Sequence, residues 1–89
     1  MYKIKQGFVL SEVAGQYIVV AVGKNTKTFN KMINLNESSA FIWKLLEKGA
    51  EPDSIVDEMA KEYDADKDTL KRDITDFIDK LDKAGLLTK

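Results

Sequence analysis

The sequence contains no cysteine, no histidine and only one proline among its 89 residues. The lack of cysteine rules out a disulfide framework, and without thiolate or imidazole ligands we expect no zinc, haem or other cofactor. The lack of histidine removes the side chain that most often serves as a general base near neutral pH. Any catalytic base would therefore have to be a carboxylate or a lysine with a strongly shifted pKa.

Long apolar runs and an excess of one charge are also absent. The longest wholly apolar run is Tyr17 to Val22, far short of the roughly 20 residues that a membrane-spanning helix needs. No charged segment followed by an apolar signal core opens the chain, so we expect a cytoplasmic protein. The 14 basic and 15 acidic residues give a net charge of −1, so no overall field attracts nucleic acid or an anionic membrane.

The first third of the chain has the pattern of β-strands, within about residues 7–35. Two stretches rich in β-branched and aromatic residues, 8–13 and 16–22, are separated by Ala14-Gly15, which is short enough for a tight hairpin turn. A third strand ends at Leu35, because apolar and polar residues alternate up to that position. Met32 breaks the alternation, which predicts either packing under a helix or a surface that something else covers.

The period then becomes helical, and three helices are expected at about 37–48, 52–63 and 67–84. Asn36 is a candidate N-cap for the first helix, which Gly49 ends. Pro52 suits the first turn of the second helix, and Asp66 is a candidate N-cap for the third. Leu86 and Leu87 are expected to fold back onto the core.

Three strands followed by three helices predict one α+β domain over residues 1–89, with a winged-helix-like, three-stranded antiparallel sheet followed by three helices. Hydrophobic residues make up 44% of the chain, which is enough for a single core. This architecture serves DNA binding, peptide binding and enzyme assembly alike, so the fold does not fix the function.

Catalysis and DNA binding both find little support in the residues. The carboxylates lie mainly on polar helix faces, where hydration keeps their pKa values ordinary. None is therefore suited to act as a catalytic base, and we expect no enzyme. A DNA-reading helix needs a basic face, because phosphate neutralisation supplies most of the affinity. The third helix instead opposes six acids to five bases: Asp66, Asp68, Asp73, Asp76, Asp79 and Asp82 against Lys67, Lys71, Arg72, Lys80 and Lys83. A winged-helix DNA-binding or adaptor module is kept as the alternative.

A small sheet beside three helices leaves at least one strand edge unpaired. An extended peptide can add to such an edge through main-chain hydrogen bonds while pockets read its side chains. The other interpretation is an edge that is merely protected, with Lys31 as the guarding charge. The composition leaves both open.

Several stretches in a fixed order carry a family resemblance. They are GFVLSE at 7–12, INLNESSAFIW at 33–43, PDSIVDEMAKEY at 52–63, DITDFI at 73–78 and a closing Gly-Leu-Leu at 85–87. Together they resemble the PqqD-like family over almost the whole chain. The resemblance implies a recognition element that binds the leader of a ribosomally made precursor peptide, acting beside a maturation enzyme such as a radical-SAM enzyme or a leader peptidase.

The resemblance also implies where the leader binds. In the family the leader lies as an added strand along the third strand, in a cleft closed by the third helix. On this chain these are residues 28–34 and 67–84, and the implied peptide-binding residues are Thr28, Phe29, Asn30, Lys31, Met32, Ile33, Lys71, Asp73, Ile74, Phe77 and Ile78.

Helical geometry divides the third helix into a core centre and two flanks. Spacing residues 100° apart puts Leu70, Ile74, Phe77 and Leu81 at the centre. Asp73 and Lys80 fall on one flank, with Lys71, Thr75 and Ile78 on the other. The sequence does not decide which flank lines the cleft, nor whether Asp73 contacts peptide or supports structure. Trp43 is expected in the core or in a dimer contact, which leaves a homodimer open.

Overall fold

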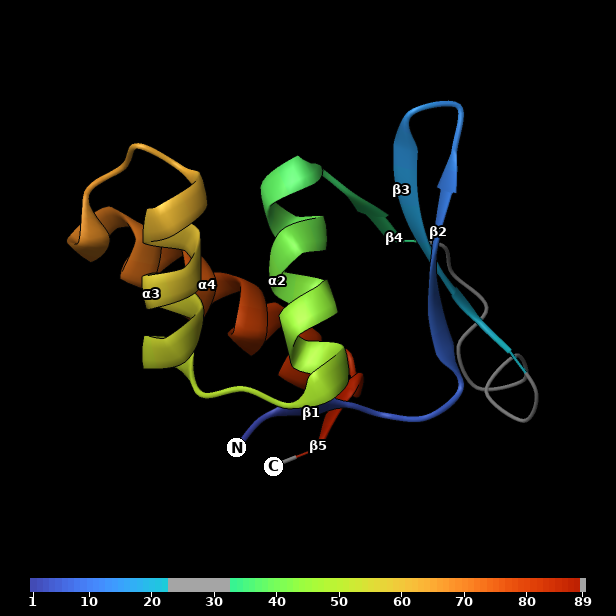
Figure 1. The fold of residues 1–89 in the computed structure, drawn as a ribbon. Helices are drawn as coiled ribbons and strands as arrows, with labels where there is room; N and C mark the ends of the chain where they lie inside the picture. The colour runs from blue at the N-terminus through green and yellow to red at the C-terminus, as the bar shows by residue number, and fades with distance from the viewer. Residues whose placement is uncertain (23–32, 89) are drawn as a thin grey trace.

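The computed structural model describes residues 1–22 and 33–88 (Figure 1). In chain order the elements are β1 (Lys3–Ile4), β2 (Phe8–Val13), β3 (Gln16–Ala21), β4 (Ile33–Leu35), α2 (Glu37–Lys48), α3 (Pro52–Glu62), α4 (Lys67–Lys83) and β5 (Leu87–Thr88). Strands β2, β3 and β4 form an antiparallel sheet in that order, and three helices follow. The α+β prediction is confirmed.

The β2–β3 hairpin turns where the sequence predicted it. Ala14 and Gly15 have φ angles of 52° and 78°, and positive φ at both central residues is what a type I′ hairpin turn requires. The strands pair from Val13↔Gln16 to Phe8↔Ala21. Strand β4 pairs only with β3 among the described strands, so it forms one edge of the sheet.

The helix boundaries follow local chemistry. The side chain of Asn36 accepts a hydrogen bond from the Ser39 amide at 2.8 Å, which confirms the predicted N-cap of α2. Pro52 opens α3, as predicted. Asp66 stands at the N-cap position of α4 but makes no side-chain capping hydrogen bond, so its predicted capping role is wrong. Helices α3 and α4 each end one residue before the predicted boundary.

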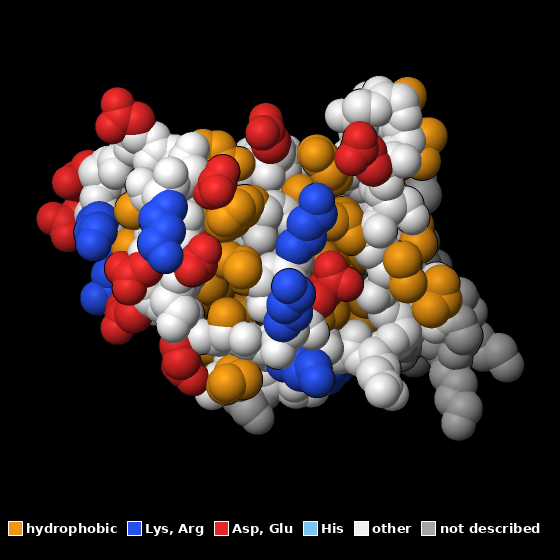
Figure 2. Space-filling model, in the orientation of Figure 1, with side chains coloured by type: hydrophobic (Ala, Val, Ile, Leu, Met, Phe, Trp, Pro, Cys, Tyr) orange, Lys and Arg blue, Asp and Glu red, His pale blue; other side chains and the backbone are white. Residues whose placement is uncertain are grey.

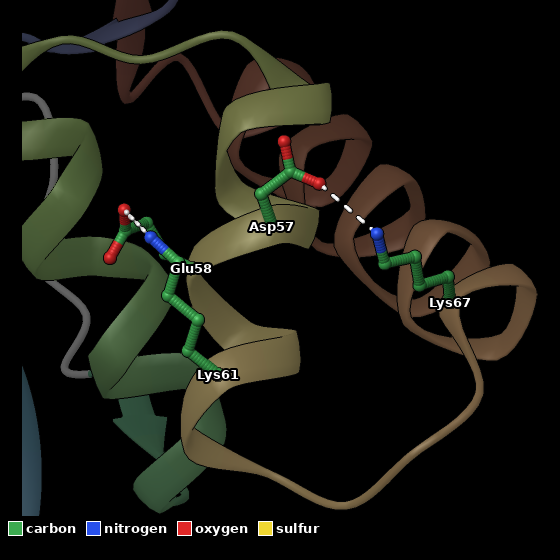
Figure 3. Close-up of polar contacts among 4 residues, drawn as sticks. All are labelled: Asp57, Glu58, Lys61 and Lys67. Carbon is green, nitrogen blue, oxygen red and sulfur yellow. Dashed lines mark hydrogen bonds and ion pairs between the residues drawn. The ribbon is translucent and has the colours of Figure 1, made fainter.

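Helices α3 and α4 pack together at the end of the molecule away from the hairpin (Figure 1). The Lys67 ammonium lies 3.6 Å from the Asp57 carboxylate and links the start of α4 to α3, while Lys61 and Glu58 pair within α3 at 3.5 Å (Figure 3). All four side chains are largely exposed, so each pair stabilises the fold by at most about 1 kcal/mol. Apolar packing must therefore hold the two helices together.

The core draws on every helix and on one face of the sheet. Its fully buried side chains are Val19, Trp43, Leu46, Ile55, Ile74 and Leu86. The lone tryptophan therefore lies in the core, and its indole Nε1 has no hydrogen-bond partner among the described residues. The opposite face of the sheet leaves Val9 and Val13 43% and 60% exposed.

A second, two-stranded sheet was not predicted. Strand β1 pairs antiparallel with β5 through Lys3↔Thr88 and Ile4↔Leu87, so the two ends of the chain lie side by side (Figure 1). Tyr2 also bridges to Ala50, between α2 and α3. Leu86 and Leu87 are buried, as predicted, because this ribbon carries them under the helices.

Candidate binding groove

Two hollows meet between β4, the first turn of α2 and the inner side of α4. The Lys80 hollow, of about 330 Å³, is lined by Lys80 with residues of β4. The Asp73 hollow, of about 280 Å³, is lined by Asp73 with residues of α2 and α3. Asn36, Ser39 and Phe77 line both hollows, so the two adjoin, and together they are called the β4–α4 groove.

The ladder geometry shows which backbone groups of β4 face this edge. The Val22 amide donates to the Gly7 carbonyl at 2.8 Å, and hydrogen-bonded pairs alternate along an antiparallel ladder. Counting back along β3, Val20 and Ile18 bond to β2, which leaves Val19 and Tyr17 to bond to β4. Their partners are Ile33 and Leu35.

Asn34 lies between these two paired residues, so its N–H and C=O point away from β3. No described strand pairs with that side of β4. The edge therefore offers a backbone donor and a backbone acceptor beside the groove, which is the arrangement to which an extended chain can add.

Helix α4 presents the flank that carries Asp73 and Lys80. Both side chains are exposed, and half-buried Phe77 lies between them. Thr75 and Ile78, on the other flank, instead line a separate hollow of about 130 Å³. The geometry thus settles which flank faces β4, a question that the sequence left open.

The predicted core centre of α4 is wrong at one position. Phe77 was placed at the centre and Ile78 on a flank, yet Ile78 is 6% exposed and Phe77 is only half buried. The β1–β5 ribbon explains the shift, because β5 contacts α4 and Tyr2 lies beside Ile78. The buried side of α4 therefore faces the ribbon, and Phe77 borders the groove.

The Asp73 end of the groove is bordered by aromatic rings and lies near acidic side chains. The Tyr63 and Phe41 rings meet edge to face, with centroids 5.9 Å apart. Partial burial, and then the negative charges of Glu37 and Glu62, raise the pKa of Tyr63, so its hydroxyl stays protonated and can donate a hydrogen bond. Acidic side chains also gather over α3 and the turn that follows it (Figure 2).

The implied peptide-binding residues are distributed unevenly over this structure. Thr28, Phe29, Asn30, Lys31 and Met32 lie outside the described residues. Ile33, Asp73 and Phe77 line the groove. Ile74 is fully buried beneath it, Ile78 packs on the far flank, and exposed Lys71 is absent from its lining.

Sequence reasoning missed the contribution of α2. Asn36, Ser38 and Ser39 line the Asp73 hollow, and Tyr63 closes it from the end of α3. A signal was present, because one residue alone separates β4 from α2, so the first helical turn must border the strand edge. Lys80 was placed on the correct flank but was left out of the predicted site.

Within residues 1–22 and 33–88 the structure offers no cluster of histidine, cysteine or acidic side chains suited to a metal ion. In the same part of the chain no helix is long and apolar enough to cross a membrane. An open sheet edge beside a groove with half-buried aromatic and exposed charged side chains defines a small binding domain of winged-helix-like fold.

Comparison with known proteins identifies the family. The family described as "Coenzyme PQQ synthesis protein D (PqqD)" matches residues 8–87. Because the match covers nearly the entire chain, this protein belongs to the PqqD family, as the sequence motifs predicted. A search of curated proteins gave no match.

Two solved structures share the fold. One is described as "TbiB1 in Complex with the TbiA(beta) Leader Peptide"; it is 29% identical, with a TM-score of 0.77 over 96% of this chain and 93% of that one. The other, "Lasso peptide synthetase B1 complexed with the leader peptide", is 17% identical, with a TM-score of 0.79 over 99% and 98% of the two chains. At that lower identity the second likeness shows the fold alone.

Proposed function

We propose that this protein captures the leader of a ribosomally made precursor peptide by strand addition at β4 and presents it to a maturation enzyme. The observation that carries the proposal is the outward-facing backbone of Asn34 beside the β4–α4 groove. Membership of the PqqD family and likeness to a protein solved with a leader peptide support it. The partner would be a radical-SAM enzyme or a leader peptidase.

In this proposal the strand edge would supply affinity and the groove would supply selectivity. Each main-chain hydrogen bond to an added strand stabilises a complex by about 0.5–1.5 kcal/mol net. Phe77 and the apolar wall of the groove supply area that a leader side chain can bury, at roughly 25 cal/mol per Å². Backbone bonds would hold any extended chain, and the groove would choose among the side chains.

The proposed contacts are the backbone at Asn34 and the side chains of Asp73, Phe77 and Lys80. Ile74 and Ile78 would shape α4 from the core rather than touch the peptide, because both are buried. Lys71 receives no contact in this proposal, since it lies outside the groove lining. The part of the predicted site at residues 28–32 stays a prediction.

The role would be binding rather than catalysis, because the sequence has no histidine or cysteine to serve as base or nucleophile. DNA binding is not favoured, since α4 carries nearly balanced charge. A cytoplasmic location and a homodimer stay predictions of the sequence.

The direct test begins with a search for a short precursor reading frame beside the gene and titrates the full chain with the synthetic leader that it encodes, with a scrambled leader as the control. Calorimetry should show saturable binding of the leader alone. NMR shifts should concentrate at Asn34, Ser39 and Phe77. Shifts confined to the outer sheet face around Val9 and Val13 would overturn docking in the groove.

A further inference from the structure

The β4–α4 groove carries opposite charges at its two ends. Asp73 lies in one hollow and Lys80 in the other, with Phe77 between them. Lys80 follows Asp73 by seven positions, which is about 10.5 Å along a helix. Among the described residues neither makes an ion pair, whereas Lys67 and Lys83 of the same helix pair with Asp57 and Asp79. Their charges are therefore available to a ligand.

The groove also has a direction. Ile33, at the start of β4, lines only the Lys80 hollow, whereas Asn36, just after β4, lines both hollows. Strand β4 therefore runs from the Lys80 end towards the Asp73 end. Antiparallel pairing is somewhat more stable than parallel pairing, so an added strand should run the opposite way, from Asp73 to Lys80.

Strand geometry converts these positions into a peptide pattern. Alternate residues of a strand point to one face and advance about 6.7 Å per pair. Along the helix axis Phe77 lies about 6 Å from Asp73 and about 4.5 Å from Lys80. The lysine side chain is long enough to cover the difference between about 4.5 Å and the strand repeat of about 6.7 Å. Three alternate residues of one strand can therefore face Asp73, Phe77 and Lys80 in turn.

We infer that the groove selects extended peptides with the order basic, any residue, apolar, any residue, acidic, read from the N-terminal end. The inference rests on the proposed function, because it specifies the ligand of the same site. Glu37 and Glu62 strengthen the preference for a cation at the first position, since their charges raise the pKa of Tyr63 at that end.

The test is selection of phage-displayed random dodecapeptides on the full chain. The matched variant is Asp73→Lys combined with Lys80→Glu, which reverses both ends and leaves the net charge unchanged. The control is Asp76→Lys combined with Lys71→Glu, since these exposed residues of α4 lie outside the groove lining. Circular dichroism checks that each variant is folded.

Wild type and control should enrich the same charge order, and the reversed variant should enrich its inverse. A peptide selected on wild type should bind the reversed variant at least about fivefold more weakly, since two exposed charge pairs become repulsive. Should the reversed variant be unfolded, Asp73→Asn and Lys80→Gln replace it, and each should lose the preference at one peptide position only.

The outcomes separate this inference from the proposed function. Peptides that are enriched without charge order, or an order that the variants leave unchanged, would overturn the charge pattern while leaving peptide binding intact. Enrichment of the inverse order on wild type would overturn antiparallel addition. If no peptide is enriched on the folded chain, the proposed function itself fails.

Discussion

Blocking single backbone amides by N-methylation tests strand addition without changing any side chain. The Asn34 amide faces the open edge, so methylating it in a semisynthetic chain removes one donor to the added strand. The expected loss is about 0.5–1.5 kcal/mol, which is about 2- to 12-fold in Kd. Calorimetry with the synthetic leader measures it, and circular dichroism on the same sample confirms folding.

Two further methylated chains complete this experiment. Leu35 bonds to β3, so methylating its amide should destabilise the domain by about 1–3 kcal/mol. Leu10 lies between two residues of β2 that bond to β3, so its own amide faces the far edge of β2. Methylating this amide should change neither folding nor binding. Full-strength binding by the Asn34 variant, or equal weakening by the Leu10 variant, would refute addition at β4.

Other predictions concern side chains. Lys80→Glu should weaken binding of the selected peptides several-fold by calorimetry, whereas Lys71→Glu should not, because only Lys80 lines the groove. Ala14→Asn should stabilise the fold by about 0.5–1 kcal/mol in urea unfolding, because asparagine tolerates the positive φ of 52° at this position better than alanine does. Burial and nearby carboxylates raise the pKa of Tyr63, so its contribution to stability is complete below pH 10 and is lost above it. Tyr63→Phe should therefore flatten the fall in the free energy of unfolding at alkaline pH.

Each of these predictions can fail separately. Equal weakening by both lysine variants would indicate a general charge effect rather than contact in the groove. An unchanged or lower urea midpoint for Ala14→Asn would show that the turn does not strain alanine. Parallel stability curves for wild type and Tyr63→Phe above pH 10 would show that titration of Tyr63 does not cause the loss of stability.

Local chemistry made much of the fold predictable. Asn36 and Pro52 mark helix starts by their own capping and φ preferences, and Ala14-Gly15 marks a hairpin by its length. The β1–β5 ribbon was not predictable in this way, because two-residue strands show no periodicity and their pairing joins opposite ends of the chain. The family motifs supplied the remaining expectation, namely a cleft between the third strand and third helix.

The site was less predictable because it depends on what packs around α4. A helical wheel gives the angles between side chains but not the direction from which neighbours arrive. Phe77 and Ile78 are neighbours in sequence and about 100° apart on the wheel, and the ribbon beside Tyr2 decided which of them is buried. The flank bearing Asp73 and Lys80 was identified only when β4 and α2 were placed against it.

The β1–β5 pairing has a consequence for how this domain could be joined to other proteins. Lys3 and Thr88 are direct partners in the ladder, so their Cα atoms lie about 5 Å apart. A host protein could therefore carry the whole domain in a surface loop, entering and leaving at nearly one point. The groove does not include either strand, so such an insertion would leave it open. A tether at either end would also start from the same place, so its length and stiffness, rather than the end chosen, would set the effective concentration of bound leader at an enzyme.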